Sequence, residues 1–252
     1  MNNLIRGEFY KLRKRKYFIG MLVLWGVFAL IFSSCILNDA YMRPNYVQEL
    51  SGINVMVRFL ETQVLSYILY AVLAGVFIAK DMEDSTLFNS FIYGYSRIEV
   101  IFSKIIVYIL VSLIYEIITI VIMGTIFSAM YGFVNTADIN IPAFLLRIIF
   151  IGFLSCISTL LISATTAVVT KNTIMTFVSP IIVFFTMFIF VNTIHTSFAR
   201  LLEWLLPYVS IEWALAPFAP IGEVYRGIAS CVIMIIITST IIFKHLEKSD
   251  LK

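Results

Sequence analysis

Six long apolar runs divide the chain, and only one of them contains a charged side chain. Each run has about 17 to 23 residues, and a helix needs about 20 apolar residues to cross the hydrocarbon core of a bilayer. The runs are Tyr17–Leu37, Thr62–Ala79, Ile105–Phe127, Ile148–Thr170, Asn172–Ile194 and Gly227–Phe243. We therefore expect an all-α polytopic membrane protein with six transmembrane helices, forming a single transmembrane domain over residues 1–252.

The charge content agrees with a membrane environment. Charged residues make up 13% of the chain, whereas a soluble domain has about 25%. No A-x-A-like cleavage site follows the first run, so we expect a retained helix and not a removed signal peptide. The three cysteines all lie in apolar runs, which favours buried small hydrophobic side chains over disulfides or metal ligands.

The first 16 residues carry six Lys and Arg residues. Within them Ile5, Phe9 and Leu12 recur at i, i+4 and i+7, which places them on one face of a helix. This pattern predicts an amphipathic helix over residues 1–16 that lies on the cytoplasmic surface of the bilayer. A nucleic-acid-binding arm is the alternative for a basic run, but the apolar run that begins at Tyr17 ties the segment to the membrane. We expect no nucleic-acid partner.

The distribution of Lys and Arg predicts the orientation. With a cytoplasmic N-terminus, 13 of the 18 Lys and Arg residues fall on the cytoplasmic side, as the positive-inside rule requires. Both termini and the polar interval 80–104 are then cytoplasmic. The turn between the fourth and fifth runs is only Thr170-Lys171-Asn172, which predicts a tight antiparallel helical hairpin.

The interval 80–104, with four acids and three bases, is the longest polar stretch inside the chain. Ser96 and Glu99 have the spacing of a capping box that starts the next helix, and Gly94 is suited to ending a short helix before it. A large ordered loop on one side of a membrane is where we expect a partner protein to dock.

The outer segment 192–225 is too apolar for a solvated loop, and its prolines divide it into pieces too short to span. It predicts short re-entrant or interfacial helices before the last span. An aromatic belt of Trp204, Tyr208 and Trp213 at the headgroups explains the segment about equally well. The first outer loop, Asn38–Glu61, is polar and carries no clear signal.

Sequence motifs for catalysis are absent. The chain has no H-E-x-x-H, no G-x-S-x-G and no adjacent pair of glutamates. His195 and His245 have no ligand partner at metal spacing. The chain also lacks a Walker A sequence, so any ATP hydrolysis must occur on another polypeptide. We expect a chain that is not an enzyme and binds no cofactor.

Two short motifs resemble bacterial type 2 ABC exporter permeases. In that family an E-F-x-K-L element precedes the first span, and here Glu8 to Leu12 reads E-F-Y-K-L. The second match lies in residues 80–104 and consists of an acid (Glu83 or Asp84), Thr86-Leu87, Ser96-Arg97 and Lys104. This chain has Ser85 where the family often has Gly, and it lacks the usual Pro before S-R. The motifs cover the first third of the chain, and the topology covers its whole length.

The resemblance implies a division of labour. Two permease subunits, identical or homologous, each sit on an ABC ATPase subunit, and the two ATPase copies hold ATP and Mg. Asp84–Tyr93 would form a coupling helix that fits a cleft on the ATPase and passes its displacement to the spanning helices. The implied ATPase-coupling residues are Glu8, Glu83, Asp84, Thr86, Leu87, Phe88, Phe91 and Arg97. A loop resting on the headgroups is the alternative, but an acidic loop suits an anionic leaflet poorly.

Glu116 is the acid within the third run. An acid at membrane depth costs a few kcal/mol and normally faces a partner or a watery cavity. Two interpretations are about equally supported. Glu116 either lines the translocation path or the dimer seam and meets a cationic substrate group, or it is a hydrogen-bonded glutamate packed against another helix. In the fourth run Ser155, Thr159 and Thr166 share a face, which favours close helix packing over a polar pore.

By resemblance, the expected function is that of the membrane subunit of an ATP-driven exporter in the bacterial cell membrane, moving hydrophobic or amphipathic substrates. The compact six-helix form resembles permeases for the export of, or immunity to, antimicrobial peptides and lantibiotics. A secondary transporter or channel is the alternative, and it would need more intramembrane ionisable groups than Glu116. A membrane assembly or sensor protein is a third class, and it would have no ATPase partner.

Overall fold

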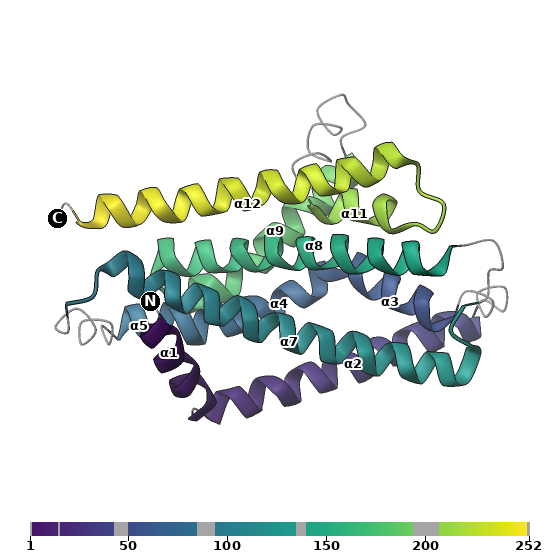
Figure 1. The fold of residues 1–252 in the computed structure, drawn as a ribbon, viewed down its shortest axis with the longest axis horizontal. Helices are drawn as coiled ribbons and strands as arrows, with labels where there is room; N and C mark the ends of the chain where they lie inside the picture. The colour runs from purple at the N-terminus through teal and green to yellow at the C-terminus, as the bar shows by residue number, and fades with distance from the viewer. Residues whose placement is uncertain are drawn as a thin grey trace.

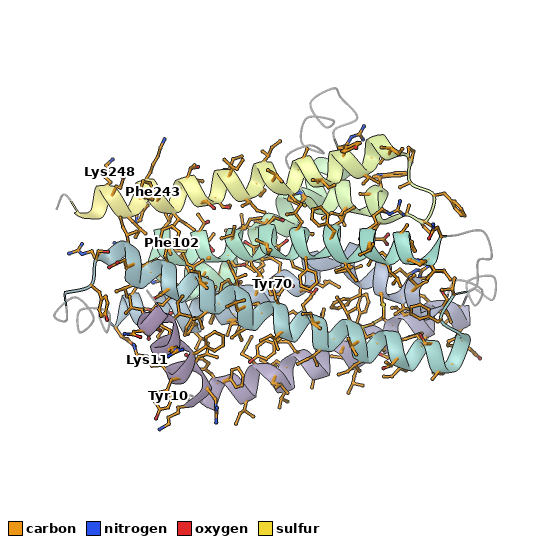
Figure 2. All side chains as sticks on the ribbon, in the orientation of Figure 1. Tyr10, Lys11, Tyr70, Phe102, Phe243 and Lys248 are labelled. Atoms are coloured by element: carbon orange, nitrogen blue, oxygen red, sulfur yellow. The ribbon has the colours of Figure 1, made fainter. Side chains whose placement is uncertain are left out.

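A computed structural model describes residues 2–14, 16–42, 50–84, 94–134, 140–193 and 207–250. Within these ranges every regular element is a helix, which confirms the all-α prediction. Long helices lie side by side along one axis, and both termini lie toward the same end of it (Figure 1). Lys11 and Lys248 are found toward that end, whereas Tyr70 lies in the middle of the bundle (Figure 2).

Five stretches of the described residues are long and apolar enough to cross a membrane, so the chain is a multi-pass membrane protein. They are Tyr17–Asp39, Leu65–Glu83, Arg97–Tyr131, Ile141–Thr170 and Ile221–Lys248. The fifth predicted run, Asn172–Ile194, coincides with α9 (Thr173–Thr193), but the apolar helix described there, Thr173–Val183, is shorter than a span. The sixth span therefore stays a prediction.

The spanning helices are longer than the apolar runs that predict them. They comprise α2 (Lys16–Met42), α7 (Arg97–Tyr131), α8 (Ile141–Thr170), α12 (Ile221–Asp250), and a path formed by α4 (Gln63–Ala74), the π-helical turn η2 (Gly75–Ala79) and α5 (Lys80–Glu83). The predicted capping box is confirmed at the start of α7. Ser96 Oγ accepts from the Glu99 amide at 3.3 Å, and Glu99 Oε2 accepts from the Ser96 amide at 3.1 Å.

The predicted hairpin between α8 and α9 is also confirmed. Only Lys171 and Asn172 connect the two helices, and Lys171 adopts a left-handed conformation with φ of 50°. Asn172 Oδ1 accepts from the Met175 amide at 3.1 Å, which satisfies one of the free donors at the start of α9. Cys156 and Cys231 are buried as expected, but Cys35 is exposed on α2. Most of the spanning part of α2 is not buried by the rest of the protein.

The loop Asn38–Glu61 contains a helix that the sequence pattern did not reveal. Helix α3 (Gly52–Glu61) begins at an N-cap, Ser51, and packs along α7. The two helices approach closely at Gly52, where an added Cβ would collide with Ser128 Oγ and lie 2.9 Å from the Gly124 carbonyl oxygen. The absence of a side chain at Gly52 is therefore what allows α3 to lie against α7.

Gly52→Ala is expected to lower the stability of the protein by about 1–3 kcal/mol, because the added methyl group overpacks the contact between α3 and α7. Thermal unfolding of the purified protein in mild detergent measures the effect. Gly26→Ala is the matched control, since a Cβ at Gly26 on α2 meets no atom within 4 Å. Equal melting temperatures for the two variants would contradict the close approach.

Two shorter helices complete the fold. In α1 (Asn2–Lys14) the predicted apolar face packs against the protein core, and Leu12 is 1% exposed. A position of α1 on the lipid surface stays a prediction. Helix α11 (Pro207–Leu215) lies within the segment 192–225 and packs against α8 and α12. Its re-entrant placement also stays a prediction, and residues 194–206 lie outside the described part of the chain.

Candidate functional site

A cluster of buried charges joins α1, α5 and α7 near the end where both termini lie. Lys104 on α7 is completely buried. Its Nζ donates to Glu8 Oε2 on α1 at 2.7 Å and to Asp81 Oδ2 on α5 at 2.5 Å. Lys11 Nζ donates to Glu8 Oε1 at 2.7 Å. One ammonium group thus holds three separate helices together.

The charges of this cluster are balanced. The carboxylates of Glu8 and Asp81 are buried and face the ammonium groups of Lys104 and Lys11. Buried ions of this kind are tolerated when they are paired and become strongly destabilising when one partner is removed. The Lys104 ammonium also lies 4.8 Å from the centre of the Phe77 ring, which belongs to the π-helical turn η2. The cluster therefore fixes the end of the second spanning path against α1 and α7.

A second contact ties the same path to α9. Glu83 Oε2 accepts from the Thr173 hydroxyl at 2.8 Å and from the Thr173 amide at 3.3 Å. A carboxylate at this position also interacts favourably with the positive end of the α9 dipole. The five residues from Lys80 to Asp84 consequently contact α7 through Asp81 and α9 through Glu83.

The predicted coupling residues fall into three groups. Glu83, Asp84 and Arg97 are exposed and flank the stretch 85–93. Glu8 is buried, with its carboxylate turned inward to Lys104, so any role in coupling must act through the cluster. The remaining predicted residues lie outside the described part of the chain: Thr86, Leu87, Phe88 and Phe91. The coupling role of all eight residues stays a prediction.

Sequence reasoning placed Lys104 in a family pattern but did not assign it partners, and it passed over Asp81. The position of Lys104, directly before an apolar run, could have suggested an ion pair. A lysine that becomes buried there needs an acid nearby to compensate its charge. The partners themselves lie 96 and 23 residues away in the sequence. Their pairing depends on how the helices pack.

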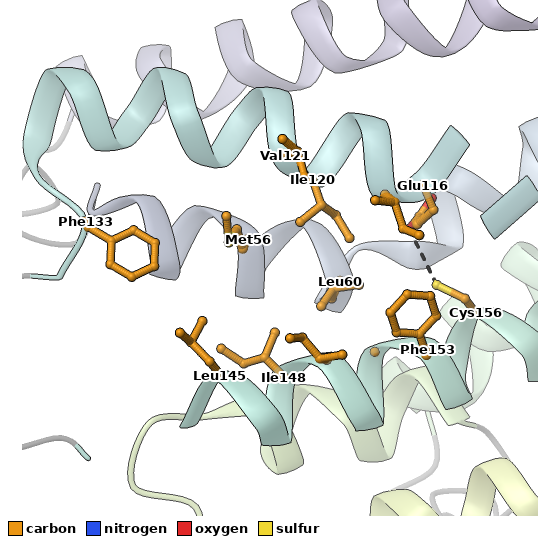
Figure 3. A pocket seen from close by; sticks show the side chains of 13 residues that line it. Met56, Leu60, Glu116, Ile120, Val121, Phe133, Leu145, Ile148, Phe153 and Cys156 are labelled. Atoms are coloured by element: carbon orange, nitrogen blue, oxygen red, sulfur yellow. Dashed lines mark hydrogen bonds between the residues drawn. The ribbon is translucent and has the colours of Figure 1, made fainter. Parts of the chain in front are cut away.

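Glu116 forms a second site, near the middle of α7. It is 2% exposed, and its Oε1 accepts a long contact of 3.7 Å from Cys156 Sγ on α8. The Tyr70 hydroxyl on α4 also interacts with the carboxyl group. Among the described residues, Glu116 Oε2 has no hydrogen-bond partner. Figure 3 shows the contact with Cys156 at one end of a cavity, with Phe133 and Leu145 toward the other end.

The cavity beside Glu116 has a volume of about 330 Å³ and lies between α3, α7 and α8. This volume is at the lower end of the range for small-molecule sites, about 300–1,000 Å³. Apart from Glu116 and Cys156, the lining side chains are apolar. Glu116 therefore lines a cavity, while its burial and its contact with Cys156 on α8 also agree with the second of the two sequence interpretations. Its place at a translocation path or dimer seam stays a prediction.

The small polar side chains of α8 are used for packing. Ser155 and Thr159 are buried and Thr166 is half-buried. The Thr159 hydroxyl donates to the Ser155 carbonyl at 3.0 Å, and the Thr166 hydroxyl donates to the Ser163 carbonyl at 2.8 Å. In the described ranges, no group of three or more His, Cys, Asp or Glu side chains is arranged to hold a metal ion.

Comparison with known proteins identifies a family. The model of a family described as ABC-2 family transporter protein matches residues 4–190, about three quarters of the chain. The match runs from α1 into α9 and so includes the charge cluster and the cavity beside Glu116. No curated protein and no solved structure matches the chain.

Proposed function

The chain belongs to the ABC-2 family of transporter proteins, and from this membership we propose that it is the permease subunit of an ATP-driven exporter. The family consists of the membrane subunits of ABC transporters, and the ATPase is a separate chain. Two ATPase copies would hold ATP and Mg and would bind two permease subunits, identical or homologous. The family match is the observation that carries this proposal.

The contacts around residues 80–104 support a mechanism for coupling. In the proposal, the ATPase binds the stretch 84–97 and displaces it when ATP closes the ATPase dimer. That stretch continues directly into α7 at the Ser96 cap. Before the stretch lies α5. Its Asp81 pairs with Lys104 on α7, which in turn pairs with Glu8 on α1. Its Glu83 accepts a hydrogen bond from Thr173 on α9. A displacement of the stretch would therefore move several helices together.

The π-helical turn η2 lies directly before α5. Such turns are local irregularities and are frequent at functional sites. In the proposed mechanism, η2 allows the end of the path to move relative to α4 while the charge cluster keeps α5 attached to α7.

The proposal also includes a topology and a substrate class. Six helices span the bacterial cell membrane, both termini are cytoplasmic, and α1 lies at the cytoplasmic surface. The common location of the two termini at one end supports an even number of spans (Figure 1). The substrates are hydrophobic or amphipathic, and membrane-active or antimicrobial peptides are the class that we propose, for export or immunity.

Purification of the chain from its native host in mild detergent tests the proposal. An ABC ATPase is expected to co-purify in a stoichiometric amount, and its reproducible absence would contradict the proposal. A secondary transporter or channel would instead purify without an ATPase. The neighbouring reading frame provides a rapid check, since a cognate ATPase contains a Walker A sequence.

The structure offers a secondary transporter little support. Among the described residues, the buried Asp, Glu and Lys side chains are Glu8, Asp81, Lys104 and Glu116. The first three are paired with one another. Glu116 is alone near the middle of a span, whereas proton-coupled or ion-coupled transport usually employs chains of such groups.

A further inference from the structure

The cavity beside Glu116 opens between α7 and α8 onto the outer surface of the helix bundle. Ile117, Val121 and Ile149 line it and are 41%, 51% and 53% exposed, respectively. Leu60 and Ile148 form its buried interior. Because the exposed side chains belong to two spanning helices, the opening faces the lipid. The cavity is therefore a groove that a molecule dissolved in the bilayer can enter from the side.

The chemistry of this groove, defined by its lining residues, is asymmetric along its length. Glu116 and Cys156 lie at one end, and the other end, near Leu145 and Phe133, is apolar (Figure 3). From Leu145 to Cys156 the lining side of α8 extends about 16 Å at 1.5 Å per residue. A ligand that fills the groove needs an extended apolar body with a polar group at one end.

The buried carboxyl group determines which polar group fits. Glu116 Oε2 has no hydrogen-bond partner among the described residues. Oε1 receives a long contact from the Cys156 thiol, which is a weak donor, and the Tyr70 hydroxyl also interacts with the carboxyl group, but neither group carries a charge. An ammonium group would supply both hydrogen-bond donors and a compensating charge. An anionic head group would be repelled, and an alcohol would supply one donor and no charge.

We propose that the groove between α7 and α8 binds a membrane-dissolved amphiphile that carries one amine at the end of an extended apolar chain. The ammonium group pairs with Glu116, and the chain lies along α8 toward Leu145. Binding itself needs no ATPase. Only the identification of this amphiphile with the transported substrate class rests on the proposed function.

Two probes of equal chain length test the ligand chemistry. Radiolabelled dodecylamine and dodecanol are each bound to the purified chain in phosphatidylcholine nanodiscs, and the uptake by empty nanodiscs is subtracted. The wild-type protein is expected to bind dodecylamine at least tenfold more tightly than dodecanol. Equal affinities for the two probes would overturn the proposal.

Three variants test the location. Glu116→Gln is expected to remove the preference for the amine while dodecanol binding persists. Val121→Trp, at the mouth of the groove, is expected to weaken the binding of both probes at least tenfold. Ile122→Trp is the matched control, because Ile122 is 42% exposed on the same helix and does not line the groove. Melting temperatures without ligand establish that each variant is folded.

Other occupants predict different results. If a second permease subunit covers the groove, Val121→Trp disrupts the dimer and the wild-type protein shows no preference for the amine, which contradicts the proposal. An amine preference that survives Glu116→Gln, or a loss of binding in Ile122→Trp equal to that in Val121→Trp, also contradicts it. The preference can be observed whether or not an ATPase co-purifies, so the two proposals fail independently.

Discussion

Lys104→Met is expected to destabilise the protein by about 3–5 kcal/mol, because it leaves Glu8 and Asp81 buried without their shared ammonium group. Methionine preserves most of the length of the side chain, so the loss reflects the charge more than the packing. For a chain of this size the change corresponds to a fall in Tm on the order of 10 °C. Thermal unfolding of the purified protein in mild detergent measures it.

Two further variants separate the buried charge from general effects of removing a lysine. Lys11 also pairs with Glu8, but its side chain is 51% exposed, and Lys11→Met should cost about 1 kcal/mol or less. The triple variant Glu8→Gln, Asp81→Asn, Lys104→Met should recover most of the stability lost in Lys104→Met, because no buried charge remains unpaired. Equal effects of Lys104→Met and Lys11→Met would contradict the buried cluster.

The triple variant also distinguishes a structural role of the cluster from a role in coupling. If the cluster serves only stability, a folded triple variant transports like the wild-type protein. If it also transmits displacement from the ATPase, the same variant shows weakened coupling at near-normal stability. Neutral amide and thioether groups replace the ion pairs there with weaker contacts between α1, α5 and α7.

Length and composition predicted the spanning helices because lipid demands long apolar helices whatever their neighbours are. The helix ends were predicted where local chemistry determines them. The capping box at Ser96 and the short connection at Lys171 involve only residues close in sequence. The predicted spans were nevertheless shorter than the helices, because a helix continues past the end of its apolar run. The run Ile105–Phe127, for example, lies within α7, which extends from Arg97 to Tyr131.

Features that depend on packing between distant segments were missed. Helix α3 mixes Asn54 and Arg58 with apolar residues and lies at the end of an interval that was interpreted as a polar loop. Its burial requires the close approach of Gly52 to α7. Glu8 was assigned only a contact with the ATPase, as the family resemblance implies. Its actual partner, Lys104, is 96 residues away. Glu116 was singled out by its depth alone, whereas the cavity beside it also requires α3 and α8.

Glu83→Lys is expected to reduce transport at least tenfold while the permease still inserts in the membrane. The substitution removes two hydrogen bonds to Thr173 and places a cation at the positive end of the α9 dipole. It also reverses a charge beside the stretch proposed to bind the ATPase. Transport and substrate-stimulated ATP hydrolysis by the complex with its ATPase, reconstituted in liposomes, measure the coupling.

Variants at neighbouring positions show which of these two contacts matters. Thr173→Val removes the hydroxyl that donates to Glu83 without changing any charge. Asp84→Lys reverses an exposed charge, and Leu87→Asp changes a predicted apolar contact. If Glu83 acts through α9, Thr173→Val reproduces part of its effect, and the double variant with Glu83→Gln costs less than the sum of the two single variants.

If Glu83 acts instead on the ATPase surface, Asp84→Lys and Leu87→Asp weaken ATPase binding, whereas Thr173→Val does not. Normal transport in Glu83→Lys, Asp84→Lys and Leu87→Asp together would make the stretch 84–97 a linker. Coupling would then have to pass through the charge cluster alone. The ion pairs of Lys104 with Asp81 and Glu8 still connect α5 to α7 and α1 when Glu83 no longer contacts α9. The triple variant of that cluster would in that case lose transport, although Glu83→Lys does not.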